Sequence, residues 1–130
     1  MKTNELTGRA LQHAVMLAED WDYFPATIYE CAMYGKGGGP RPTWTVTGPD
    51  YLTGQAGDAV IDRHRISTVR LNDLYFPSGN EKGEHWEAYF CATCAGEKRY
   101  GATRREAAMR AYVASKLGEE VEIPDEFLEA

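Results

Sequence analysis

The sequence lacks the features of membrane proteins and of secreted proteins. It has no run of about 18 apolar residues, the length that a membrane-spanning helix needs. Its first residues, MKTNELTGRAL, lack the uninterrupted apolar stretch of a secretory signal. The three cysteines are an odd number, which does not fit a framework of disulfides. We therefore expect a cytoplasmic protein with no membrane partner.

Basic charge is also scarce. The chain has 14 Lys and Arg residues against 20 Asp and Glu residues, for a net charge of -6. Residues 106–130 hold two basic and seven acidic side chains, so this segment accounts for -5 of the total. Because no block of the sequence is basic, nucleic-acid binding is disfavoured. The length of 130 residues and the 43% hydrophobic content predict one globular domain, residues 1–130.

Two helices are predicted, one near each end of the chain. Residues 7–20 place Leu11, Ala14, Val15 and Ala18 on one apolar stripe, with Thr7 as N-cap. The second helix follows Thr103, which forms a capping box with Glu106, and ends before Gly118. After it, Val121 and Ile123 share one side of an extended segment, and Pro124 permits a last helical turn.

The middle of the chain predicts short strands separated by glycine-rich connections. The expected strands are 27–34, 43–47, 66–71 and 85–92, the connections are 35–42 and 48–58, and 76–84 is an exposed turn. Strands without helices between them favour antiparallel pairing. The predicted fold class is α+β: a small, mainly antiparallel sheet packed by the N-terminal and C-terminal helices, with Trp44 in the core.

The stretch YGKGGGPRP places Lys36 beside three glycines. A phosphate-binding P-loop requires a helix after the lysine, but here two prolines and a strand follow. We interpret this segment first as a mobile connection. The alternative is a loop that closes over a ligand, with Lys36 and Arg41 supplying positive charge.

The cysteines leave one metal-site alternative open. Cys91 and Cys94 form half of a zinc knuckle, which Cys31 and one of the three histidines could complete. Because these ligands are scattered, we interpret the cysteines as small buried hydrophobic residues and expect no cofactor.

No nucleophilic triad is readable in the sequence, and an enzyme is the less favoured class. Asp50, Asp58 and Asp62 are close enough in sequence to suggest a metal-dependent enzyme. The stretch DRHR, residues 62–65, is read first as a solvated strand entry. Its alternative role is anion or nucleotide recognition, because guanidinium groups match phosphate oxygens.

Aromatic residues are abundant enough to form a recognition surface. Tyr51, in a glycine-rich stretch, and Trp86, near a strand start, are candidates for a stacking pocket. The candidate ligand-binding residues are Asp50, Tyr51, Arg63, Arg65, Trp86 and Lys36.

Two stretches, ELTGRALQHAV at the start and AAMRAYVASKLGEEVEIPDEFL at the end, resemble the NinX-like proteins of lambdoid phages and prophages. The middle is similar more loosely, through Asp50 and Tyr51, Gly54 and Gly57, and the DR step at residues 62–63. Tyr51 stands where that family tends to have tryptophan. The resemblance implies a small accessory protein made early in phage infection, acting in the host cytoplasm, and it supplies no activity.

Dispensable phage proteins of this size often antagonise host defences, so by analogy we expect a protein that acts by binding. Its partner would be a small nucleotide-like signal, which it sequesters, or a host protein, which it blocks. The alternatives are a nucleotide- or nucleic-acid-processing enzyme and a small zinc-binding protein. Whether the chain forms a homo-oligomer is left open.

Overall fold

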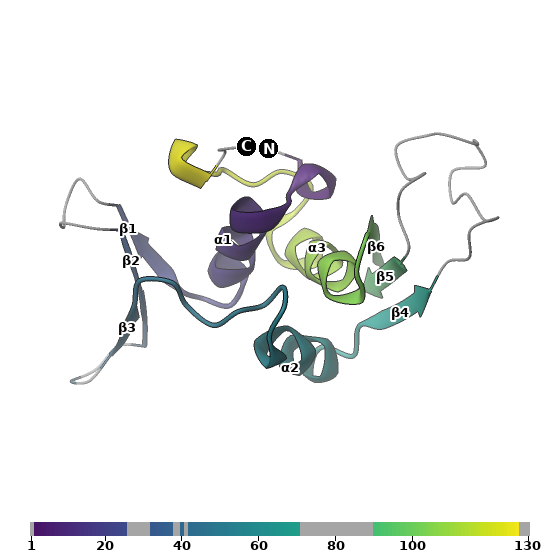
Figure 1. Ribbon diagram of the computed structural model, residues 1–130, viewed down its shortest axis with the longest axis horizontal. Coiled ribbons are helices and arrows are strands. Elements are labelled where there is room, and N and C mark those ends of the chain that lie inside the picture. The colour runs from purple at the N-terminus through teal and green to yellow at the C-terminus, as the bar shows by residue number, and fades with distance from the viewer. Residues whose placement is uncertain (1, 26–31, 38–39, 41, 71–89, 128–130) are drawn as a thin grey trace.

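The computed structural model describes residues 2–25, 32–37, 40, 42–70 and 90–127. Within these residues it has three α-helices and two three-stranded antiparallel sheets. The α+β class and the antiparallel pairing are confirmed, but the strands form two sheets where we predicted one. The sheets lie at opposite ends of the molecule, and the helices lie between them (Figure 1).

The N-terminal helix α1, Gly8–Ala18, confirms the first predicted helix. Thr7 occupies the N-cap position with an extended backbone, although its side chain makes no capping hydrogen bond. The buried stripe of α1 includes Leu11, Ala14 and Val15 as predicted. The chain leaves the helix through Asp20, whose positive φ of 67° prevents another helical turn.

The C-terminal helix α3, Arg104–Leu117, confirms the second predicted helix and its start. The hydroxyl of Thr103 accepts a hydrogen bond of 3.0 Å from the N–H of Glu106. In return, the Glu106 carboxylate accepts one of 3.0 Å from the N–H of Ala102. Gly118 ends the helix with a φ of 92°, a left-handed conformation that favours glycine.

The central helix α2, Gln55–Arg63, occupies the second part of the predicted connection 48–58 and the start of the predicted strand entry 62–65, so both predictions were wrong for these residues. The helix buries Val60 and Ile61 in the core. Gly57 is required for packing rather than for a loop, because a Cβ there would lie 2.2 Å from the carbonyl oxygen of Tyr51. Packing therefore outweighs the low helix propensity of glycine here.

The first sheet has the order β1-β2-β3, formed by Asp22–Phe24, Met33–Lys36 and Thr43–Thr45. β3 falls within a predicted strand, whereas the prediction for 27–34 meets β2 only at residues 33–34, and residues 27–31 lie outside the described residues. Trp44, predicted in the core, is 46% exposed. Its ring lies across Gly35, its partner on β2, and beside Phe24 at 5.2 Å between centroids.

The second sheet has the order β4-β5-β6, formed by Ser67–Arg70, Phe90–Cys94 and Glu97–Gly101. β4 confirms the strand predicted near 66–71, and β5 overlaps the one predicted at 85–92. Residues 71–89, which include the predicted turn at 76–84, lie outside the described residues. The sheet packs against α3 so closely that a Cβ on Gly101 would lie 2.6 Å from the backbone nitrogen of Ala107.

One continuous core joins these elements, with its largest fully buried side chains on α1 and α3. The N-terminal and C-terminal segments lie side by side at one edge of this core. There the N–H of Thr3 donates a hydrogen bond of 2.7 Å to the carbonyl of Glu119. Val121 and Ile123 are buried, as their shared side predicted, and Asp125–Phe127 forms the final helical turn. No helix within the described residues is long and apolar enough to span a membrane.

Candidate functional site

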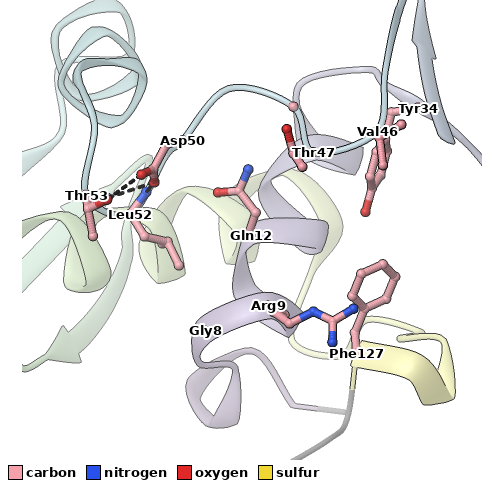
Figure 2. A pocket seen from close by; sticks show the side chains of 11 residues that line it. Gly8, Arg9, Gln12, Tyr34, Val46, Thr47, Asp50, Leu52, Thr53 and Phe127 are labelled. Carbon is pink, nitrogen blue, oxygen red and sulfur yellow. Dashed lines mark hydrogen bonds between the residues drawn. The ribbon is translucent and has the colours of Figure 1, made fainter. Parts of the chain in front are cut away.

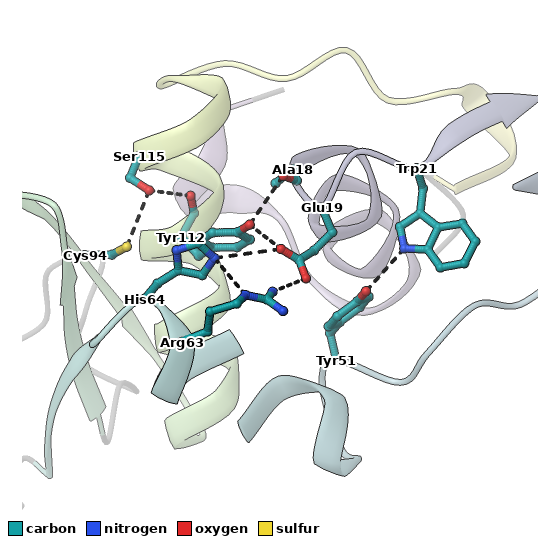
Figure 3. Close-up of polar contacts among 9 residues, drawn as sticks. All are labelled: Ala18, Glu19, Trp21, Tyr51, Arg63, His64, Cys94, Tyr112 and Ser115. Carbon is teal, nitrogen blue, oxygen red and sulfur yellow. Dashed lines mark hydrogen bonds and ion pairs between the residues drawn. The ribbon is translucent and has the colours of Figure 1, made fainter. Parts of the chain in front are cut away.

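Glu19, the residue after α1, is the centre of a cluster of polar and aromatic side chains between the three helices (Figure 3). It is only 9% exposed. Its carboxylate accepts hydrogen bonds from the hydroxyl of Tyr112 on α3 and from the guanidinium of Arg63 on α2. One carboxylate therefore ties the ends of α1 and α2 to the middle of α3.

The protonation states in this cluster follow from its contacts. Burial alone would raise the pKa of Glu19, but hydrogen bonds from Tyr112 and Arg63 and the charges of Arg63 and Lys36 outweigh it and lower the pKa. Burial, followed by the charge of Arg63, lowers the pKa of His64. The His64 Nε2 atom accepts a hydrogen bond of 3.3 Å from Arg63, which fits a neutral imidazole. The cluster thus holds an ionised carboxylate paired with Arg63.

Three of the predicted site residues meet in this cluster. Arg63 binds Glu19, and the Lys36 Nζ atom lies 5.4 Å from the centroid of the Trp21 ring. The indole N–H of Trp21 points to the hydroxyl of Tyr51 at 3.4 Å. Tyr51 is only 4% exposed, so its ring presents no open face to a ligand. These three residues lie near one another, but their contacts are with other residues of the protein.

The other three predicted site residues lie elsewhere. Arg65 is exposed just after α2, with a φ of 50°. Asp50 lines the cavity described next. Trp86 lies outside the described residues.

The cavity has a volume of about 610 Å³ and lies between α1, residues 46–53 and the final turn (Figure 2). Gln12 of α1 lines the cavity and binds the segment 46–53. The Gln12 Oε1 atom accepts from the N–H of Tyr51 at 3.1 Å, and its Nε2 atom donates to the carbonyl of Pro49 at 2.5 Å. One amide side chain therefore binds the segment at two adjacent residues.

Asp50 stands at one end of the cavity, in the turn that leads into α2. One of its carboxylate oxygens accepts from the N–H groups of Leu52, at 3.0 Å, and Thr53, at 2.9 Å, and the other accepts from the Thr53 hydroxyl. These bonds, that of the Thr53 side chain first, lower the pKa of Asp50. The backbone N–H of Gly54 lowers this pKa further, so the carboxylate is held ionised by several donors of its own turn.

Arg9 and Phe127 stand at the opposite end of the cavity from Asp50 (Figure 2). The Arg9 guanidinium carbon lies 5.2 Å from the centroid of the Phe127 ring. Phe127 stacks in turn on His13, with centroids 4.6 Å apart. Stacking on an aromatic face positions a guanidinium while leaving its N–H groups available.

A hydrogen bond of 2.6 Å between His13 Nδ1 and the Tyr34 hydroxyl completes this wall. Burial lowers the pKa of His13 to about 4 and raises that of Tyr34 to about 12. Both groups are therefore uncharged near neutral pH, and Arg9 is the cation that lines the cavity. His13 is buried and serves to position Tyr34 and Phe127.

The three aspartates of the enzyme alternative do not converge on a shared site. Asp58 forms a two-point contact with Arg105, at 3.1 and 2.7 Å, while Asp50 is engaged by Thr53. Asp62 is exposed on α2. Within the described residues, no group of three or more His, Cys, Asp or Glu side chains is arranged to hold a metal ion.

The described cysteines, Cys91 and Cys94, are buried and are not joined in a disulfide. Cys94 contacts the hydroxyl of Ser115 at 3.4 Å. Cys31 lies outside the described residues, so the complete zinc set cannot be built from those that are described.

Comparison with known proteins gives no relative: the chain matches neither a protein-family model nor a curated protein. The resemblance to the NinX-like proteins stays a prediction. The predicted site residues do not include the ones that organise the Glu19 cluster and the cavity, which are Glu19, Gln12, Arg9 and Phe127. For Arg9, its place in the first turn of a helix without a side-chain cap was the available signal.

Proposed function

We propose that this protein acts by binding, as a phage or prophage accessory protein, and that the cavity between α1 and residues 46–53 takes a small nucleotide-like ligand. The proposal depends on one observation: Arg9, held by the ring of Phe127, faces a cavity of about 610 Å³ whose far end carries Asp50. This volume lies within the range of roughly 300–1,000 Å³ that small-molecule sites occupy.

The two ends of the cavity favour complementary parts of a nucleotide. The guanidinium of Arg9 matches phosphate oxygens, and the adjoining N-terminus of α1 adds a partial positive charge. At the other end, the exposed carboxylate of Asp50 supplies negative charge that suits a ribose hydroxyl or an exocyclic amine. Tyr34, Val46 and Leu52 give the intervening walls apolar surface for a base or a sugar.

The biological role rests on the resemblance of the chain ends to NinX-like proteins and on analogy with other small phage proteins. In this role the protein would sequester a nucleotide signal that a host defence system uses. Each catalytic alternative needs convergent carboxylates or a metal set, whereas the binding role needs only the cavity. We therefore propose no enzymatic activity.

A thermal-shift screen tests this proposal directly. The full-length chain is heated alone and with cyclic nucleotides and ADP-ribose isomers. A ligand at about 100 times its Kd adds roughly 2.7 kcal/mol to the free energy of unfolding, which corresponds to several degrees in Tm. Arg9→Ala should lose the response, and Arg70→Ala, which removes an exposed arginine on the distant strand β4, should keep it.

Absence of a shift with every nucleotide would overturn the ligand proposal. The remaining version of the binding role would then be the blocking of a host protein. A shift that Arg9→Ala and Arg70→Ala retain equally would place the ligand outside the cavity.

A further inference from the structure

A second hollow, which we call the acidic groove, adjoins the first cavity at the ring of His13, which contacts Tyr34 and Phe127. It has a volume of about 650 Å³ and is lined by residues from α1 and β1 and by the segment 117–125. His13 lines this groove, whereas Tyr34 and Phe127 line the first cavity. The two hollows are therefore neighbours with different linings.

The acidic groove combines apolar surface with exposed negative charge. Leu17, Leu117 and Val121 contribute apolar lining, and Leu117 is 37% exposed. Glu120, Glu122 and Asp125 supply three exposed carboxylates, and no lysine or arginine lines the groove. Among the described residues, these carboxylates take part in no salt bridge; the described acidic partners of cations are Glu19, Asp58, Glu97 and Glu106.

From this charge complementarity we infer that the acidic groove docks a basic segment of another protein, in which lysine or arginine flanks aliphatic residues. The carboxylates would pair with the basic side chains, and the apolar lining would bury the aliphatic ones. A small hydrophilic cation would leave the surface of Leu17, Leu117 and Val121 unused. The inference is separate from the proposed function, because it uses a different hollow and a different class of partner.

The test begins with a library of random 12-residue peptides displayed on particles and selected on the immobilised full-length chain. We expect the enriched peptides to carry net positive charge and aliphatic residues. A selection that yields no peptide, or yields neutral or acidic ones, would overturn the inference.

Fluorescein-labelled copies of the enriched peptides are then titrated and followed by anisotropy. Glu120→Gln combined with Glu122→Gln should weaken binding roughly fivefold to tenfold, since two exposed ion pairs are lost. The control, Asp20→Asn combined with Asp62→Asn, changes the net charge equally at exposed positions outside the groove. It should change the affinity by less than about twofold, because distant charges are screened by salt.

Equal weakening by the two double variants would show that only the net charge attracts the peptide, and it would contradict the inference. Leu117→Asn, which removes an exposed apolar side chain, should weaken binding while leaving the helix intact. The parent protein could also self-associate, and Glu120→Gln with Glu122→Gln could abolish this association. That result would assign the acidic groove to a second copy of the chain and would also overturn the inference. The nucleotide response of the first cavity should not change in any of these variants.

Discussion

The Glu19 cluster and the cavity between α1 and residues 46–53 contain the same kinds of residues in opposite states. Each has a carboxylate, an arginine and aromatic rings. In the cluster, Glu19 is buried and takes hydrogen bonds from Arg63 and Tyr112. In the cavity, Arg9 and Asp50 stand at opposite ends of an open volume and do not pair with each other.

The comparison shows that an arginine beside aromatic residues is not in itself a sign of a binding site. Arg63 is taken up by a carboxylate that the fold needs, so its charge is neutralised within the protein. The guanidinium of Arg9 lies against the ring of Phe127 and forms no salt bridge among the described residues, so its charge is available to the ligand that we propose. What separates the two is whether the partners within the protein already satisfy the charge.

The largest expected effect is on stability, from Glu19→Ala. The change leaves the buried hydroxyl of Tyr112 with only the 3.3 Å bond to the carbonyl of Ala18, and it removes the partner of Arg63. We expect a loss of about 3 kcal/mol in the free energy of unfolding. Urea denaturation measures it, with Asp20→Asn as a control on the neighbouring exposed carboxylate. A loss below about 1 kcal/mol would mean that the cluster does not hold the three helices together.

The next prediction concerns the pH dependence of stability, which differs between the cavity wall and the Glu19 cluster. His13 in the cavity wall has a pKa of about 4, below its ordinary value of 6.5, so the folded protein binds fewer protons than the unfolded chain between these values. Stability should therefore fall by roughly 3 kcal/mol as the pH drops from 6.5 to 4. His13→Phe, which cannot titrate, should remove this part of the profile in urea titrations.

The lowered pKa of Glu19 acts in a different range. Its stabilising contribution is complete above the unfolded pKa, 4.5, and is lost as the pH falls through the lower folded value. Retention of the full slope between pH 6.5 and 4.5 in His13→Phe would contradict the assignment of that slope to the cavity wall.

Gly57→Ala should have a smaller effect, of about 2 kcal/mol, and it tests the link between the two regions. Alanine normally stabilises a helix relative to glycine. Here the added Cβ would meet the carbonyl of Tyr51 at 2.2 Å and push apart α2 and the turn that carries Asp50. Thermal unfolding of Gly57→Ala measures whether helix propensity or the steric contact has the larger effect. The control is Ala59→Gly, at an exposed position of the same helix. A Tm at or above that of the parent protein would show that the contact is easily relieved.

The sequence predicted those parts of the fold that local chemistry determines. The cap at Thr103 and the glycine at 118 define α3 within one turn at each end, so its bounds could be read directly. The packing of Gly57 under Tyr51 depends on tertiary contact, and this is why α2 was taken for a loop. β6 was missed because its charged residues, EKR, become a strand only by pairing with β5.

The candidate site was less predictable than the fold, for a related reason. Lys36, Tyr51 and Arg63 were all named as candidate site residues, yet their partners, Glu19 and Trp21, come from the end of the first helix and the residues after it. The cavity joins Arg9 to Phe127, residues at opposite ends of the sequence. No local pattern encodes such a pairing.

The most direct measurement compares Arg9→Ala with Arg63→Ala in one thermal-shift experiment, with and without a nucleotide that stabilises the parent protein. The account predicts that Arg9→Ala melts within about 2 °C of the parent but no longer responds to the nucleotide. Arg63→Ala should melt several degrees lower and still respond. The opposite pattern, with the response lost in Arg63→Ala and kept in Arg9→Ala, would contradict the account.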